Sequence, residues 1–411
     1  MREPLDAPLI ERLAREYGTP LYVYDGDRIA RQLASLERFD VVRFAQKACS
    51  NIHILRLLRE AGAQVDAVSL GEIERALLAG YDGRGEPAGV VFTADVCDEA
   101  TLVRVVENGI PVNAGSADML AQLGRRSPGH RVWLRVNPGF GHGHSRKTNT
   151  GGEWSKHGIW HEYLDEALNL IEKHRFDLVG LHMHIGSGSD FEHLRHVCDA
   201  MVSQVRSLGV DVRAVSGGGG LPIPYREEDP PFDTAALHEL WDAARREVAE
   251  IVGHPVSLEI EPGRYLVGEA GVLVGEVRAA KRVGPTRFAL LDAGFDNLVR
   301  PAMYGSYHAI SVLRDGAPAP GLPEPCVVGG PLCESGDVFT QEEGGLVVPR
   351  DLPEMRVGDL VVLHDAGAYG AAMASNYNTR PLAPEVLVEQ GRPRLIRRRQ
   401  PFDDLLGLER V

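Results

Sequence analysis

The feature that most constrains this chain is a regular alternation of short β-branched runs with amphipathic helical stretches, from about residue 30 to residue 264. Helix-like segments such as 51–62 and 69–80 separate the runs. Eight strands that alternate with helices are the number that closes a (β/α)₈ barrel of parallel strands. We therefore predict a TIM-type (β/α)₈ barrel over residues 31–264. The predicted strands are 41–45, 64–68, 89–93, 110–113, 131–137, 178–185, 211–216 and 256–261.

The rival arrangement is an open, doubly wound α/β sheet. That fold commonly carries a G-x-G-x-x-G turn after its first strand, and none follows here. Within the helix expected over 69–80, Ser69 and Glu72 have the spacing of a capping box, and Gly80 predicts the helix end. The pattern favours the barrel.

After Arg264 the pattern changes. Glycine, proline and aspartate turns separate short apolar runs, and helix-length amphipathic patterns are scarce. This texture predicts a second, mostly antiparallel β domain. The LYVYD run at 21–25 has the same character, so we expect residues 1–30 to join residues 265–411 in that domain. The runs behind this prediction are 271–283, 287–294, 359–367 and 384–390.

Charge and composition limit the partners. The chain holds 44 Lys and Arg against 58 Asp and Glu, a net charge of −14, and shows no basic stripe, so we expect no nucleic-acid partner. The sequence has no window of about 18 apolar residues and no signal-like segment, so we expect no membrane partner. The five cysteines are scattered without a C-x-x-C pair, which indicates reduced thiols and a cytoplasmic protein.

Residues with reactive or binding side chains stand at the carboxyl ends of the predicted strands, where barrel enzymes place their reacting groups. Glycine-rich turns expose backbone N–H groups that bind phosphate. One lysine beside such a turn, with an acid opposite, suits pyridoxal phosphate: the lysine forms a Schiff base and the acid keeps the pyridine nitrogen protonated. In chain order the strand-end residues are Lys47, Asp66, Asn137, HIGSG (184–188), SGGGG (216–220) and EPGR (261–264).

Taken singly, these residues have other readings. A lysine after a strand is usually a solvated charge. The histidines of HMH (182–184) lie on one face of a strand, as a metal pair would, and GHGH (141–144) suggests the same. A metal site needs a convergent third ligand, so we expect no metal. A metal-dependent barrel hydrolase remains an alternative class, although it gives no role to Lys47.

Seven segments follow one another in an order that resembles a known family. They are similar to the alanine-racemase-type (fold type III) pyridoxal enzymes, which include the ornithine and diaminopimelate decarboxylases. The resemblance is closest to the diaminopimelate decarboxylases and extends from about Gly18 to the C-terminus. Residues 139–159 also resemble the active-site loop of the bacterial enzymes. The segments are FAQKACSN (44–51), HIGSG (184–188), GGGG (217–220), EPGR (261–264), RPAMYGSYH (300–308), PLCESGD (331–337) and GAYGAAMASNYN (367–378).

The resemblance implies a role for each residue of the cofactor site. Lys47 carries pyridoxal 5'-phosphate as a Schiff base, His184 stacks against the pyridine ring, and Glu261 hydrogen-bonds the ring nitrogen. The phosphate-binding residues that the resemblance implies are Ser187, Gly220, Glu261, Pro262, Gly263 and Arg264, with Tyr369 from the β domain.

The resemblance also implies a substrate site shared between two subunits. Arginine pairs with a carboxylate in two parallel hydrogen bonds, so Arg264 and Arg300 hold the distal carboxylate. Cys333 is the acid that protonates the substrate carbon after carbon dioxide leaves. Cys333 and Glu334 come from the neighbouring subunit, which implies a homodimer. The other substrate-binding residues implied are Tyr304, Tyr369 and Glu334, the last of which meets the distal ammonium.

The reaction implied is decarboxylation of meso-2,6-diaminopimelate at its D centre to L-lysine and carbon dioxide, the last step of bacterial lysine synthesis. The alternative is a related decarboxylase for D-lysine or D-ornithine, whose substrates lack the carboxylate that the arginines would bind. A catalytically dead relative has no reason to keep both Lys47 and Cys333. Cys49 and His157 depart from many relatives, which have asparagine and phenylalanine at these positions.

Overall fold

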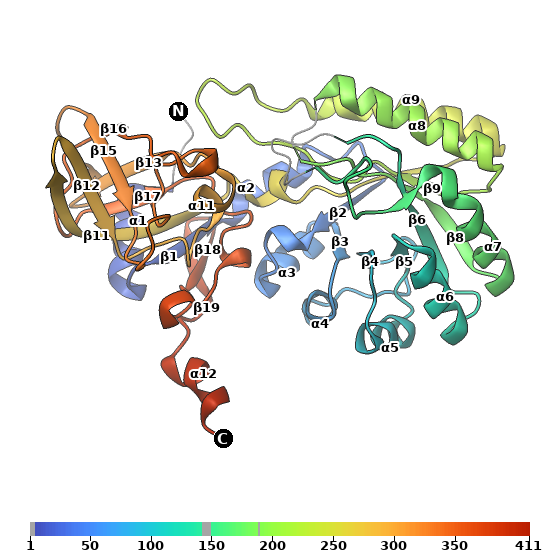
Figure 1. Cartoon of the computed structure of the whole chain (residues 1–411), viewed down its shortest axis with the longest axis horizontal. Helices are drawn as coiled ribbons and strands as arrows, with labels where there is room; N and C mark the ends of the chain where they lie inside the picture. The colour runs from blue at the N-terminus through green and yellow to red at the C-terminus, as the bar shows by residue number, and fades with distance from the viewer. Residues whose placement is uncertain (1–4, 142–148, 188–189) are drawn as a thin grey trace. The chain divides into compact units, whose positions relative to one another are not determined.

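The computed structural model describes residues 5–141, 149–187 and 190–411, and the chain divides into two units (Figure 1). We call the unit formed by Ala30–Pro222 and Phe232–Tyr265 the barrel unit. The other, the β unit, comprises Met1–Ile29, Ile223–Pro231 and Leu266–Val411. The chain therefore enters the β unit three times.

Eight parallel strands close into a cylinder in the barrel unit. Each pairs with its neighbour in the order β2-β3-β4-β5-β6-β8-β9-β10, and β10 pairs again with β2. The predicted (β/α)₈ barrel is confirmed, and closure excludes the open doubly wound sheet. The strands are β2 (Val41–Ala45), β3 (Gln64–Ala67), β4 (Val90–Ala94), β5 (Val112–Ala114), β6 (Arg131–Asn137), β8 (Asp177–His182), β9 (Ala214–Ser216) and β10 (Ser257–Ile260), with β7 (Ile159–Trp160) beside β6.

A buried ion pair joins the first and last strands of this cylinder. Arg43 of β2 donates from Nε to Glu259 Oε2 at 2.5 Å and from Nη2 to Oε1 at 3.1 Å. Both side chains are at most 5% exposed. A two-pronged arginine–carboxylate pair fixes distance and orientation together, so this pair holds β10 in register against β2.

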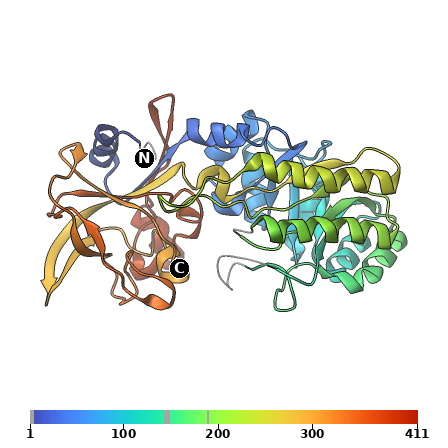
Figure 2. The same ribbon diagram turned by 90° about the horizontal axis from the view of Figure 1, so that it is seen from above.

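Helices follow the strands of the barrel, and α8 and α9 lie side by side in both views (Figures 1 and 2). At the start of α4, Ser69 Oγ accepts from Glu72 N, and Glu72 Oε2 accepts from Val68 N in return. Gly80, at φ +95°, follows the helix end as predicted. The helices are α2 (Gly26–Ala34), α3 (Ile52–Glu60), α4 (Leu70–Leu78), α5 (Glu99–Asn108), α6 (Ala117–Arg126), α7 (Leu164–His174), α8 (Phe191–Leu208), α9 (Thr234–Val252) and α10 (Arg264–Val267).

The β unit is built on a ten-stranded sheet. Its pairings are antiparallel except for β1–β18 and β12–β15, so the predicted mostly antiparallel architecture is confirmed. β1, from the N-terminal LYVYD run, lies between β11 and β18. The strands are β1 (Leu21–Asp25), β11 (Gly271–Val283), β12 (Thr286–Leu291), β13 (Ile310–Arg314), β14 (Ala317–Pro318), β15 (Glu324–Gly329), β16 (Arg350–Leu352), β17 (Leu360–Leu363), β18 (Glu385–Glu389) and β19 (Arg392–Arg397).

Three α-helices accompany this sheet: α1 (Ala7–Tyr17), α11 (Arg300–Tyr304) and α12 (Phe402–Leu406). Ile10 and Leu13 of α1 are buried against Val23 and Val274 of the sheet, which gives the unit its own apolar core. In the ranges that the structure describes, no helix has both the length and the apolar character to span a membrane.

Candidate active site

Lys47 and Glu261 follow two strands that are neighbours in the barrel. Lys47 lies in a single 3₁₀ turn directly after β2, and Glu261 directly follows β10. The amide of Ala45 donates to the carbonyl of Pro262 at 3.1 Å, which ties the two segments together. The Lys47 side chain is exposed and its charge acts on the carboxyl of Glu261. The structure therefore brings together the lysine and the acid that the sequence singled out.

Glu261 is a buried carboxylate held in its charged form. It is 8% exposed, and its Oε2 lies 2.8 Å from His182 Nε2. Burial raises the pKa of this carboxyl, but the charge and hydrogen bond of His182, with the charges of Arg135 and Lys47, outweigh burial. The pKa of Glu261 is therefore below its ordinary value, and the group is an anion that can stabilise a cation beside it.

Half-buried His184 and buried Asp66 belong to the same cluster. Burial, followed by the positive charges of Lys47 and Arg135, lowers the pKa of His184 well below its ordinary value. Burial, followed by the charge of Glu261, raises the pKa of Asp66 well above its own. Within the described residues, His184 Nδ1 and Asp66 Oδ1 are buried without a hydrogen-bond partner. Such atoms carry a desolvation cost unless a ligand or water meets them.

The glycine turn after β9 packs against backbone on both sides. A Cβ on Gly219 would lie 2.4 Å from the carbonyl oxygen of Glu261, and one on Gly220, at φ +99°, 2.3 Å from that of Gly186. Only glycine fits at these two positions. Across the described ranges, the amides of Gly219 and Gly220 donate to no acceptor in the chain. The turn thus presents two N–H groups to an anion such as phosphate.

The loop that carries His157, a residue that departs from many relatives, is anchored beside this cluster. Asn137, at the end of β6, accepts from the amides of Gly139 and Gly152 at 3.1 and 2.9 Å. At the far end of the loop, His157 Nδ1 lies 2.5 Å from Asp95 Oδ2. His157 therefore holds the loop through a charged partner that phenylalanine would lack. The histidines of GHGH at 142 and 144, and the glycine at 188, lie outside the described residues.

In the β unit, two of the predicted substrate residues lie on α11. Arg300 is buried, and its guanidinium contacts His308 Nε2 at 3.1 Å and donates to Ser306 Oγ at 3.2 Å. The same group stacks over the ring of Tyr225, 4.9 Å from its centroid. Tyr304 ends the helix and is half-buried. Packing on several sides fixes where the Arg300 guanidinium points.

Cys333 and Glu334 are exposed on a turn after β15. The amide of Cys333 donates to Asn378 Oδ1 at 3.1 Å. Buried Asp337 shapes the turn, since its Oδ2 accepts from Leu332 N at 2.8 Å. Burial raises the pKa of Asp337 to about 6. The turn is rigid at its base while its two reactive side chains face solvent.

The sequence alone does not indicate a functional role for His182, Arg135 or Asp95. The alternation in HMH was the available signal for His182, but its partner, Glu261, lies 79 residues further on. Tyr369 is half-buried and takes a left-handed conformation at φ +58°, which is uncommon for a side chain of its size. The part of the chain that the structure describes contains no group of three or more His, Cys, Asp or Glu side chains placed to bind a metal.

Comparison with known proteins identifies relatives over nearly the whole chain. Residues 27–268 match the family model of the pyridoxal-dependent decarboxylases, pyridoxal binding domain. The chain is 63% identical over 406 residues to a diaminopimelate decarboxylase of Streptomyces coelicolor, covering 98% of this chain and 92% of that protein. It is 62% identical over 407 residues to that of Escherichia coli K12, covering 98% and 97%.

Solved structures give the same result. A crystal structure of diaminopimelate decarboxylase superposes with a TM-score of 0.96 at 61% identity, covering 98% of this chain and 96% of that one. The Helicobacter pylori diaminopimelate decarboxylase complexed with L-lysine matches with a TM-score of 0.82 at 30% identity, covering 97% and 99%.

Proposed function

The chain belongs to the diaminopimelate decarboxylases, and from this premise we propose that it decarboxylates meso-2,6-diaminopimelate at its D centre, releasing L-lysine and carbon dioxide with pyridoxal phosphate as cofactor. The observation that carries this proposal is the ionised, buried Glu261 beside Lys47 at the carboxyl end of the barrel. Bound pyridoxal phosphate supplies an electron sink for the carbon–carbon bond that breaks.

The residues of the barrel unit fit this cofactor. Lys47 offers an exposed amine, and the free amides of Gly219 and Gly220 suit a phosphate. The neutral ring of His184 suits stacking against another aromatic ring, since no charge has to be desolvated. The further residues proposed to hold the cofactor are Ser187, Pro262, Gly263, Arg264 and, from the β unit, Tyr369.

Glu261 and His182 act as a pair in this proposal. His182 occupies only Oε2 of the carboxylate, which leaves Oε1 for the pyridine nitrogen. By holding Glu261 ionised, His182 favours a proton on that nitrogen. We assign His182 a positioning role, because it acts through Glu261 rather than on the substrate.

Specificity for a substrate with two carboxylates follows from the arginines. Arg264 and Arg300 are both buried, at 9% and 5% exposure, and arginine can pair with a carboxylate through two parallel hydrogen bonds. We propose that they hold the distal carboxylate together with Tyr304 and Tyr369. D-Lysine and D-ornithine would leave this site without its anion.

We further propose that the active site is completed by a second copy of the chain. Cys333 delivers the proton to the substrate carbon, and Glu334 binds the distal ammonium, in the neighbouring subunit. Support comes from the exposure of both side chains on a turn whose base is rigid. All five cysteines are free thiols, which agrees with a cytoplasmic setting.

Lysine release tests the reaction. Purified protein with pyridoxal phosphate should release L-lysine from meso-diaminopimelate, and protein stripped of cofactor should not until cofactor is restored. Faster turnover of D-lysine than of meso-diaminopimelate would contradict the proposal.

Mixing two inactive variants tests the shared site. Lys47→Ala and Cys333→Ala subunits should regain activity when combined, because one of the two sites in a mixed dimer then has both groups intact. Activity no higher than that of either variant alone would show that each chain uses its own Cys333.

A further inference from the structure

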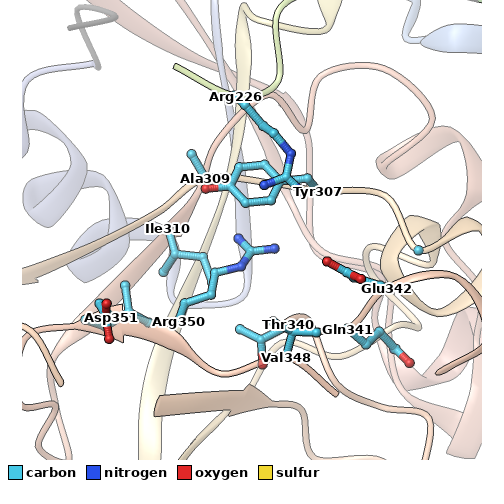
Figure 3. A pocket seen from close by; sticks show the side chains of 12 residues that line it. Arg226, Tyr307, Ala309, Ile310, Thr340, Gln341, Glu342, Val348, Arg350 and Asp351 are labelled. Carbon is cyan, nitrogen blue, oxygen red and sulfur yellow. The ribbon is translucent and has the colours of Figure 1, made fainter. Parts of the chain in front are cut away.

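A cavity in the β unit is lined by none of the proposed substrate residues, although Gly305 and Tyr307 closely follow Tyr304, and Arg226 follows Tyr225, over which Arg300 stacks. Its volume is ≈ 340 Å³, within the range of small-molecule sites. Segments from three parts of the chain line it: the 223–231 stretch, the strand region after α11, and residues 340–352 (Figure 3). The lining side chains used below are Arg226, Tyr307, Glu342 and Arg350.

Two guanidinium groups meet at one aromatic ring in this cavity. Arg226 lies over the Tyr307 ring with its guanidinium carbon 4.2 Å from the centroid, and Arg350 lies 3.9 Å from it. Figure 3 shows both groups directed toward the cavity. Stacking of this kind fixes the plane of a guanidinium and leaves its N–H edge for an anion.

In the described residues, neither Arg226 nor Arg350 forms an ion pair with a carboxylate. Arg350 donates one hydrogen bond to the carbonyl of His308. Burial of Arg350 and the charge of Arg226 lower the pKa of Arg350, which shows that the two like charges act on each other. An anion paired with both would offset this repulsion.

The facing wall carries the opposite charge. Glu342 is exposed, and Figure 3 shows its carboxylate directed toward the same space as the Arg350 guanidinium. Its charge is close enough to raise the pKa of Arg350 against the effect of burial. A plain dianion would be attracted by one wall and repelled by the other. A ligand with a carboxylate and an ammonium a few bonds apart matches both.

We propose that this cavity is a second binding site, separate from the decarboxylase site, for a free α-amino acid. The carboxylate of the ligand pairs with Arg226 and Arg350, and its ammonium pairs with Glu342. The amino acid that the reaction itself delivers, L-lysine, is a ligand of this kind. L-Lysine is therefore the probe of choice.

Equilibrium dialysis of labelled L-lysine against the cofactor-loaded enzyme tests the site. The number of molecules bound per subunit should be two, and only one should change the absorbance of the bound cofactor. In Arg226→Met and in Arg350→Met, the Kd for L-lysine at the site that does not change the cofactor absorbance should rise by about tenfold or more. Each substitution removes a charge-assisted contact. Arg226 is exposed, so its replacement is compatible with folding even where that of Arg350 is not.

Two controls sharpen the test. Arg282→Met removes an exposed arginine of β11 outside the cavity and should leave both sites unchanged. Hexanoate, which has the carboxylate without the ammonium, should bind the wild type weakly and Glu342→Gln more tightly.

Three results would overturn the proposal: one lysine per subunit in the wild type, a second site indifferent to both arginine variants, or hexanoate binding as tightly as L-lysine. Because the cofactor signal reports the decarboxylase site separately, failure of the second site leaves the proposed reaction untouched.

Discussion

The two units present their proposed active-site residues in opposite ways. In the barrel unit, Asp66, His182 and Glu261 are buried, and burial together with neighbouring charges shifts the pKa of Asp66 and of Glu261. In the β unit, Cys333 and Glu334 are exposed; the amide of Cys333 donates to Asn378 Oδ1, and Glu334 Oε1 accepts from the amide of Ser335. The barrel unit thus contains a buried cluster, whereas the turn that carries Cys333 and Glu334 presents both side chains to solvent.

This difference indicates which steps each unit can perform alone. A buried, ionised carboxylate and a neutral histidine are what a cofactor needs, and the barrel unit supplies both. A proton donor must be shielded from water to act on one carbon, and the turn at 331–337 does not supply that shield by itself. We therefore assign cofactor binding to the barrel unit, and we expect Cys333 and Glu334 of a second chain to complete the active site.

The largest expected effect is that of Lys47→Ala. Loss of the only amine proposed to carry the cofactor should lower kcat by about 10³-fold or more. Lys173→Ala, an exposed lysine of α7, should leave kcat unchanged. Steady-state assays with excess cofactor make the comparison, and a Lys47→Ala enzyme of near-normal rate would break the assignment to the barrel unit.

Glu261→Gln should have the next largest effect. The amide has the same shape but no charge, so it cannot hold a proton on the pyridine nitrogen, and kcat should fall by about 10²-fold. The cofactor should remain joined to Lys47, as its absorbance would show. A rate within a factor of about two of wild type would mean that the anion is not required.

His182→Gln should have a smaller and pH-dependent effect. His182 lowers the pKa of Glu261, so its loss raises that pKa and protonates the carboxyl at a higher pH. The acid limb of the kcat profile should therefore move to higher pH, while kcat on the plateau falls by less than about tenfold. A uniform loss at every pH would indicate a merely structural role.

Asp337→Asn should have the smallest effect, on stability in the β unit. The folded-state pKa of Asp337, about 6, lies above the ordinary value of 3.8, so the folded state binds the proton more tightly than the unfolded state. The wild type should lose stability as pH rises through the window from 3.8 to about 6. Over this pH window the Tm of Asp337→Asn should change less than that of the wild type, by roughly 2–5 °C. Equal slopes in both proteins would contradict the raised pKa.

The sequence predicted the barrel well because its signals are local. The bounds of the runs at 41–45 and 131–137 coincide with β2 and β6, since each run is rich in the β-branched and aromatic residues that favour strands. Placing reactive residues at strand ends needed only the rule that parallel strands of a barrel end on one face. That rule is enough to bring Lys47 and Glu261 together.

Side-chain contacts that depend on closure of the barrel could not be predicted from the sequence. His182 meets Glu261 across the intervening strand β9, which requires the register of three strands. The stacking of Arg226 and Arg350 on Tyr307 joins three distant segments, and none of the three carries a periodic signal. The exposure of Cys333 is likewise a property of the folded unit, because a lone cysteine in sequence reads as a small buried residue.

Borohydride reduction of the cofactor-loaded enzyme, followed by peptide mapping, identifies the amine that carries the cofactor. Reduction fixes the cofactor to whichever amine holds it. The account predicts that the label lies on Lys47 alone and that meso-diaminopimelate added before reduction diminishes it. A label on any other lysine, with Lys47 unmodified, would contradict the account.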